Sequence, residues 1–178
     1  MSTDINPLYK KFFEIIRYSL NPDRASVPDT TDMDWWELYK FSSEQAILGV
    51  VFNAIEKLND KRIDKQLLFQ WLADVEQIKV KNTQLNYCCV KVMDELRQAG
   101  LEPCLLKGQG NSVMYPFPHY RAPGDIDLLI KNVNRKEIIS YLTKESYSVL
   151  GVHYQHIEYE YNHILVELHL MPCTVNNP

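Results

Sequence analysis

Two acidic residues separated by a single position lie in an otherwise apolar stretch that runs from Gly124 to Ile130. Successive side chains of a β-strand point to opposite faces, so Asp125 and Asp127 share one face while the aliphatic residues between them face a core. Two neighbouring ionised carboxylates repel each other and resist desolvation, and a divalent cation relieves both costs. The spacing therefore predicts a metal site, with a charged, solvated edge strand as the alternative interpretation.

The other residues that could take part in this chemistry lie on two further expected strands. A short apolar segment, residues 103–107, ends at Gly108, which predicts a strand, a turn and then a short helix. A later apolar strand is expected at 164–170, where Glu167 and His169 share a face because they are two residues apart. An exposed acid on a half-buried strand is the ordinary alternative for the glutamate.

The N-terminal half of the chain carries apolar residues at helical spacing. Residues 4–99 are expected to be helical throughout, with a capping box at Ser42 and Gln45 and a helix end at Gly100. Beyond residue 100 the pattern becomes mixed, which predicts an α+β protein with a helical region at 1–99 and a mixed sheet with flanking helices at 100–178. The stripe of the longest expected helix contains Trp71, Val75, Ile78, Asn82, Leu85, Cys89, Val92 and Leu96.

Composition limits the class of protein. The chain has 178 residues, 46% of them hydrophobic, which is enough for a sizeable core. A formal net charge of -4 argues against a general nucleic-acid binder, which normally presents a basic face. The N-terminus lacks the basic start and apolar run of a secretory signal, and no membrane span is expected, so we predict a cytoplasmic protein. Reduced thiols are expected at Cys88, Cys89, Cys104 and Cys173.

Histidines near the C-terminal end offer a second kind of metal ligand. Zinc is the less favoured interpretation, because neither a cysteine pair nor a helical H-E-x-x-H motif accompanies them. His169 is instead expected to reach the acids or to have a structural role. The histidines concerned are His153, His156, His163 and His169.

Several short motifs occur together in a fixed order along the C-terminal half. They are Leu106-Lys107-Gly108, Tyr115-Pro116, Arg121, Asp125-Ile126-Asp127 and Val166-Glu167-Leu168-His169. This order resembles the nucleotidyltransferase superfamily related to DNA polymerase β, and most closely a family of uncharacterised bacterial nucleotidyltransferase-like proteins. The resemblance covers about residues 101–171. It departs from the superfamily pattern at Gln109, where a serine usually follows the glycine, and in the long interval between Gly108 and Asp125.

The resemblance implies transfer of a nucleoside monophosphate from an NTP to a hydroxyl acceptor, with release of pyrophosphate. Asp125, Asp127 and Glu167 would be the catalytic residues and would bind Mg²⁺ or Mn²⁺. The acceptor could be a small molecule, a sugar or a protein, and the acidic charge balance makes nucleic acid less expected. The residues expected to bind substrate are Lys107, Gly108, Gly110, Ser112, Arg121 and His169.

Two further expectations accompany this assignment. The alternative function is a catalytically silent regulator that binds a nucleotide or a partner protein on the same fold. The chain ends shortly after Glu167, which suggests that the nucleotidyltransferase-like core at 100–178 is truncated at its C-terminus.

Overall fold

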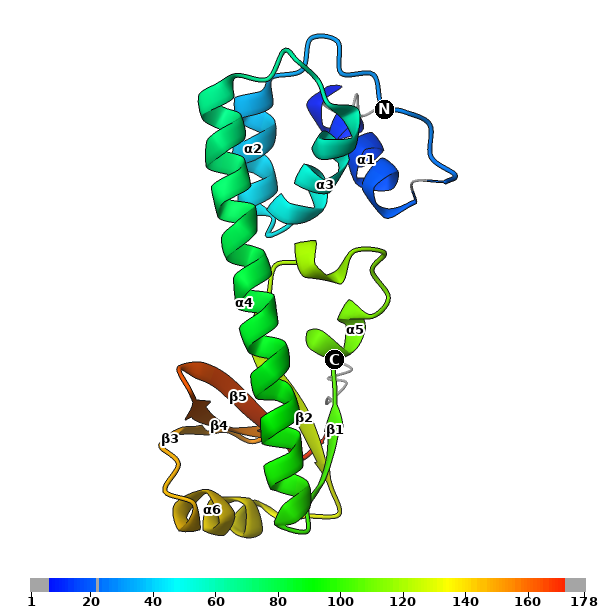
Figure 1. The fold of residues 1–178 in the computed structure, drawn as a ribbon. Helices are drawn as coiled ribbons and strands as arrows, with labels where there is room; N and C mark the ends of the chain where they lie inside the picture. Colours follow the sequence, from blue (N-terminus) through cyan, green and yellow to red (C-terminus); the bar gives the residue numbers. More distant parts are fainter. Residues whose placement is uncertain (1–6, 22, 172–178) are drawn as a thin grey trace. The chain divides into compact units, whose positions relative to one another are not determined.

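The computed structural model describes residues 7–21 and 23–171 and confirms the α+β class (Figure 1). Helices occupy the N-terminal half, and a five-stranded sheet with short helices follows. The helices are α1 (Pro7–Leu20), α2 (Trp35–Glu44), α3 (Leu48–Leu58), α4 (Lys65–Gln98), α5 (Gln109–Ser112), the 3-10 helix η1 (Pro118–Tyr120) and α6 (Arg135–Lys144). The strands are β1 (Glu102–Leu105), β2 (Ile126–Lys131), β3 (Val149–Val152), β4 (His156–Tyr161) and β5 (Ile164–His169).

The chain forms two compact units whose boundary lies inside α4. One unit contains Met1–Asn82 and Met114–Ala122, and the other contains Thr83–Val113 and Pro123–Pro178. This boundary falls earlier than residue 100, where the sequence pattern changes, because the two halves of the long helix pack into different cores. Folding of 1–99 and 100–178 as separate domains remains a prediction.

The first unit, the helical unit, is built around the N-terminal half of α4. The Trp71 side chain is fully buried, and its indole N–H donates to the Leu48 carbonyl oxygen at 3.2 Å. The expected capping box at Ser42 and Gln45 is wrong. Ser42 lies inside α2, where its hydroxyl is fully buried and donates to the Tyr39 carbonyl oxygen at 2.8 Å. Burial of this face extends α2 past the serine, and the next helix begins only at Leu48.

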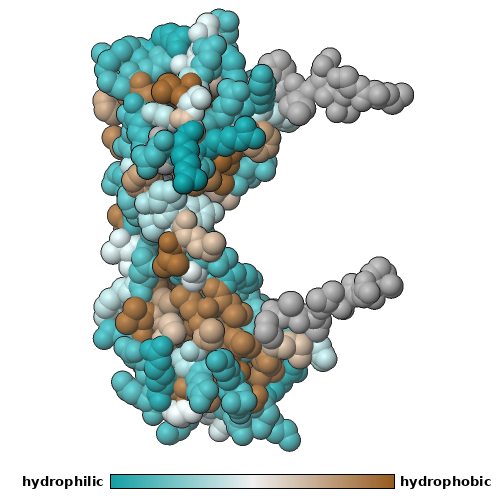
Figure 2. Space-filling model, turned by 90° about the vertical axis from the view of Figure 1, so that its right-hand side faces the viewer, coloured by the Kyte–Doolittle hydropathy of each residue, from teal (hydrophilic) through white to brown (hydrophobic). Residues whose placement is uncertain are grey.

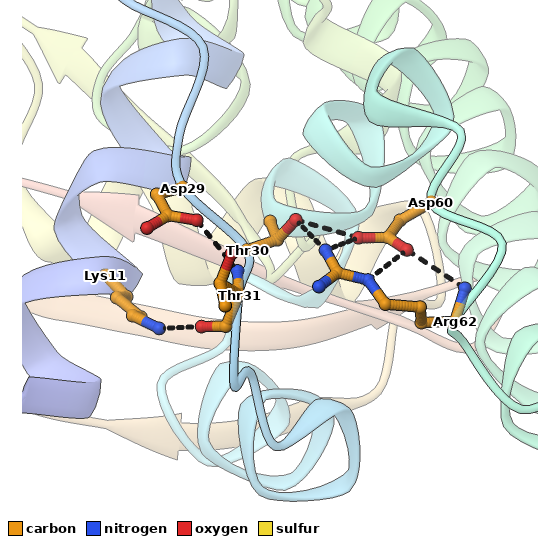
Figure 3. A network of polar contacts seen from close by, with 6 residues as sticks. All are labelled: Lys11, Asp29, Thr30, Thr31, Asp60 and Arg62. Carbon is orange, nitrogen blue, oxygen red and sulfur yellow. Dashed lines mark hydrogen bonds and ion pairs between the residues drawn. The ribbon is translucent and has the colours of Figure 1, made fainter.

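A polar network ties the connections of the helical unit together (Figure 3). The Asp60 carboxylate accepts hydrogen bonds from the Thr30 hydroxyl at 2.7 Å and from the Arg62 Nε at 2.9 Å. The Arg62 guanidinium is the largest cause that holds the pKa of the Asp60 carboxyl far below its usual range. On the other side of the network, the Lys11 amine donates to the Thr31 carbonyl oxygen.

The second unit, the sheet unit, has the strand order β1-β2-β5-β4-β3. The pair β2–β5 is parallel and the other pairs are antiparallel, so the sheet is mixed, as expected. One face of the sheet packs against the C-terminal half of α4 and against α6. The buried residues of this core include Leu85, Val92, Leu96, Ile126, Leu128, Ile138, Leu142, Ile157, Val166 and Leu168.

Two predictions for α4 are confirmed. The α4 stripe is buried except at Ile78, which is partly buried, and the helix ends before Gly100, whose φ of +81° suits a glycine. Asn134 caps α6, with Glu137 completing the capping box. Both features fix the helices that cover one face of the sheet, which leaves the other face for polar residues.

Three described cysteines are free thiols. Cys88 and Cys89 are buried in α4, and Cys104 is exposed on β1. Cys173 lies outside the described residues.

The surface mixes hydrophilic and hydrophobic residues, with a broad hydrophobic area over the unit that carries the sheet (Figure 2). Within the described ranges, no helix combines the length and the apolar character needed to cross a membrane.

Candidate functional site

Strand register gathers the polar residues on the face of the sheet opposite the core. Directly paired residues on neighbouring strands point to the same face. Pairing of β2 with β5 places Asp127 beside Glu167, and pairing of β5 with β4 places Glu167 beside Glu158. The next row along the same strands contains Leu129, His169 and His156. One face of three adjacent strands therefore carries Asp127, Glu167, Glu158, His169 and His156.

The three acids of the sequence motif converge. Asp125 lies immediately before β2, and Asp125, Asp127 and Glu167 each offer a carboxylate oxygen within 4.8 Å of the other two. Asp127 is only 2% exposed. Hard carboxylate oxygens are the ligands that Mg²⁺ and Mn²⁺ prefer, so the donor set suits such an ion.

His169 lies within the acid cluster. Its Nε2 is 3.0 Å from Asp127 Oδ1 and 3.1 Å from Glu167 Oε2, and the residue is 7% exposed. Ionised carboxylates only accept hydrogen bonds, so with both acids ionised Nε2 carries the proton. The imidazole thereby holds the two carboxylates at a fixed separation.

Lys107 approaches the same carboxylate from the end of β1. Its Nζ is 3.0 Å from Asp127 Oδ1, while 62% of its side chain remains exposed. The hydrogen bond to Asp127 is the largest cause of a raised pKa for the Lys107 amine, and the charges of Glu167 and Asp125 act in the same direction. The lysine is therefore a largely exposed cation that contacts a buried acid.

Gly108 makes the turn that separates Lys107 from α5. Its φ of +59° with ψ of -114° is a backbone conformation that side chains disfavour, so the turn requires glycine. A Cβ at this position would lie 3.8 Å from Asp127 Oδ2, so the turn runs close beside the acid. The Gly110 N–H donates to the Lys107 carbonyl oxygen at 3.1 Å and closes the turn.

Two polar residues of α5 are turned inward. Gln109, which departs from the superfamily pattern, is 6% exposed and its amide donates to the Asn86 side-chain oxygen. The Ser112 hydroxyl is buried and donates to the Gln109 carbonyl oxygen at 2.7 Å. Binding of substrate by Ser112 remains a prediction.

Arg121 belongs to the helical unit. Its carbonyl oxygen accepts a hydrogen bond from the Asn82 amide at 2.6 Å, which fixes the backbone after η1. Its expected contact with substrate also remains a prediction.

Sequence reasoning missed Glu158 and left His156 outside the site. Both lie on β4 and share the polar face, and the His156 ring lies beside the His169 ring with centroids 5.2 Å apart and the ring planes tilted by 44°. Their signal in the sequence is the alternation of polar residues with buried Ile157 and Tyr159 along β4. That alternation shows which face of β4 is polar, but it does not show that β4 pairs with β5.

Comparison with known proteins assigns the chain to a family. The model of a family described as "Uncharacterised nucleotidyltransferase" matches residues 31–178, which is most of the chain. The chain belongs to this nucleotidyltransferase family. No curated protein and no solved structure matched it.

Membership of this nucleotidyltransferase family confirms the resemblance and implies an NTP as substrate. Nucleotidyl transfer generally uses divalent metal ions, and the described residues contain carboxylate and histidine groups able to hold one. The match extends over both units, since it begins in the connection before α2.

Proposed function

We propose that this protein transfers a nucleoside monophosphate from an NTP to a hydroxyl acceptor, using Mg²⁺ or Mn²⁺. The observation that carries the proposal is the convergence of three carboxylates, a histidine and a lysine on one sheet face, in a member of a nucleotidyltransferase family. The acceptor is a small molecule, a sugar or a protein.

The metal would be held by Asp125, Asp127 and Glu167. Bound there, a divalent ion supplies charge neutralisation for the phosphates and lowers the pKa of a coordinated hydroxyl. Asp127 suits a direct ligand because a buried, ionised carboxylate needs a cation at short range. In the present arrangement the Lys107 amine supplies that cation, and His169 Nε2 lies 3.0 Å from the same carboxylate oxygen.

In the reaction, the acceptor oxygen forms a bond to the α-phosphorus. The bond from that phosphorus to the oxygen bridging to the β-phosphate breaks, and its electron pair leaves with pyrophosphate. The proton of the acceptor hydroxyl passes to a carboxylate, for which Glu167 is suited because 15% of its side chain is exposed while its neighbour Asp127 is enclosed.

Lys107 and His169 support this step from two sides. The long, largely exposed Lys107 side chain can move from Asp127 to the phosphates of the NTP, where an ammonium pairs with the phosphate oxygens both before and during transfer. His169 keeps its Nε2 proton between Asp127 and Glu167 and preserves their orientation.

The test is a comparison of two labels on the same NTP. With Mg²⁺ or Mn²⁺, label in the α-phosphate should pass to an acceptor in a panel of sugars, small molecules and proteins, and γ-label should leave in pyrophosphate. Asp127→Asn should abolish transfer while only weakening nucleotide binding, because the metal acts mainly in the transition state. Glu160→Gln, an exposed acid on β4, is the matched control.

Lys107→Ala should raise the dissociation constant for NTP more than it lowers the maximal rate, since it removes a contact made before and during the reaction. The control Lys131→Ala removes an exposed lysine at the C-terminal end of β2. It should change neither the dissociation constant nor the maximal rate. Metal-dependent NTP binding without any Asp127-dependent transfer across the panel would replace this proposal with the silent regulator.

A further inference from the structure

A second group of metal ligands lies at the β3–β4 hairpin, beside the acid cluster but built from other residues. His153, His156 and Glu158 each offer one ligand atom, and these atoms all lie within 4.8 Å of one another. Imidazole nitrogens with a single carboxylate suit Zn²⁺ and neighbouring transition metals rather than Mg²⁺, which prefers oxygen ligands.

Hairpin register explains why these three side chains meet. Gly151 pairs with Glu158, and Val152 pairs with the fully buried Ile157. His153 follows opposite His156, where its N–H donates to the His156 carbonyl oxygen at 2.9 Å. Directly opposite residues point to the same face, so the two histidines and the glutamate all lie on the side of the sheet away from the core.

The distances match those of a tetrahedral ion. His153 Nε2 and His156 Nε2 lie 3.2 Å and 3.0 Å from the same atom, Glu158 Oε1. Ligand bonds of 2.0–2.1 Å in a tetrahedral zinc site place neighbouring ligand atoms roughly 3.3 Å apart. The same spacing also fits two histidine N–H groups that donate to one carboxylate. A second observation is therefore needed to support a metal site.

Gly151 provides that observation. A Cβ at this position would lie 2.7 Å from His153 Nε2 and 2.9 Å from Glu158 Oε2, which is closer than side-chain carbons approach such atoms. The absence of a side chain on β3 is therefore what lets the imidazole and the carboxylate close over the strand. A strand interior otherwise disfavours glycine, and a glycine there often marks a site of close approach.

Exposure leaves room for a further ligand. The His153 side chain is 52% exposed, whereas those of His156 and Glu158 are 21% and 26% exposed. Three protein ligands with one side open to solvent are the pattern of zinc sites that keep a position for water or substrate.

We propose that His153, His156 and Glu158 form a binding site for Zn²⁺ or a similar transition-metal ion, with an open position that accepts water or an anionic oxygen. The site uses none of the three acids proposed to hold Mg²⁺, although His156 also lies within reach of Glu167, and it does not depend on nucleotidyl transfer. His169 belongs to the acid cluster instead, because its Nε2 is already engaged by Asp127 and Glu167.

The test uses the full chain after treatment with a chelator. One equivalent of Co²⁺ should bind and give the visible absorption of a tetrahedral ion, and Zn²⁺ should displace it. His153→Ala should weaken Zn²⁺ binding by more than about tenfold, since loss of even an outer partner reaches that scale. The matched control is His163→Ala, because His163 pairs with Glu160 at 3.2 Å, is 96% exposed and belongs to no three-ligand group among the described residues.

A glycine pair tests the geometry without removing a ligand. Gly151→Ala should weaken Zn²⁺ binding to a similar extent, whereas Gly124→Ala should not, because a Cβ at Gly124 would meet nothing within 4 Å. Asp127→Asn should leave Zn²⁺ affinity unchanged, so failure of the transferase proposal and failure of this site are distinguishable. The proposal is overturned if the protein binds neither ion at one equivalent, or if His153→Ala and Gly151→Ala bind Zn²⁺ as tightly as the wild type. Loss of binding in His169→Ala alone would move the site to the acid cluster and equally overturn it.

Discussion

Asp127→Asn separates the role of Asp127 in folding from its role in metal binding, and the structure gives the size of each effect. The substitution keeps the shape of a side chain that is 2% exposed but removes one charge. Asp125 and Glu167 offer oxygens within 4.8 Å. At that distance two like charges repel by about 1 to 3.5 kcal/mol, between the dielectric constant of water and that of a protein surface.

The substitution also removes favourable contacts. The pair with Lys107 contributes about 0 to 1 kcal/mol, since the lysine side chain is 62% exposed and screened by solvent. Replacing the charged acceptor of the His169 hydrogen bond by a neutral one costs about 1 kcal/mol. The relieved repulsion, about 1 to 3.5 kcal/mol for each of the two neighbouring carboxylates, is at least as large as the lost contacts, so without metal the variant should be at least as stable as the wild type.

Added metal should stabilise the wild type but not Asp127→Asn. For wild-type protein, Mg²⁺ or Mn²⁺ at a hundred times its dissociation constant adds about 2.7 kcal/mol of stability, which for a chain of this size raises the unfolding midpoint by roughly 5 to 10 °C. Thermal unfolding followed by circular dichroism, with metal and with chelator, measures this rise. Asp127→Asn should abolish it and Glu160→Gln should keep it. A rise retained in Asp127→Asn, or absent from the wild type with both ions, would refute the assignment of Asp127 as a ligand.

Three further predictions concern stability and are measured by chemical denaturation. Leu96→Ala should cost about 2 to 5 kcal/mol because it opens a cavity in the core under the sheet, whereas Val90→Ala on the exposed side of α4 should cost less than about 0.5 kcal/mol; equal costs would contradict the packing of the helix. Glu95→Ala should cost about 2 to 4 kcal/mol, since two partly buried tyrosine hydroxyls lose their acceptor. Arg62 holds the pKa of Asp60 low. The stability that the Asp60 carboxylate contributes is therefore fully present above its ordinary pKa, about 4, and is lost as the pH falls below that value toward the lowered pKa. The difference between wild type and Asp60→Asn should therefore shrink from pH 7 to pH 3, and a constant difference would speak against the network.

Features set by local periodicity could be predicted from the sequence. The α4 stripe was predictable because each of its residues repeats the helical spacing, and burial follows directly from that spacing. The division of β2 into an apolar face and an acid face was predictable from its period of two. The capping box of α6 was predictable from the spacing of Asn134 and Glu137. These features depend on residues close together in the chain.

Features set by strand register could not be predicted in the same way. No local signal states that β2 pairs with β5 in parallel, or that Glu158 lies beside Glu167, since these partners are far apart in sequence. The significance of Gly151 depends on the side chain of Glu158 across the hairpin. Ser42 shows the opposite case, because its sequence matched a capping box while burial of the residue extended the helix through it.

The acid on β2 also favours the correct register between β2 and its neighbouring strands. Shifting β2 by one residue against its neighbours would turn Asp127 toward the aliphatic core and expose Ile126 and Leu128 to water. An ionised carboxylate in that core costs several kcal/mol, far more than the thermal energy that drives strands to slip. The acids thus penalise misregistered sheets during folding, before any substrate is present. Substitutions that neutralise them are therefore expected to broaden the set of structures the chain can adopt, even where they leave its stability unchanged.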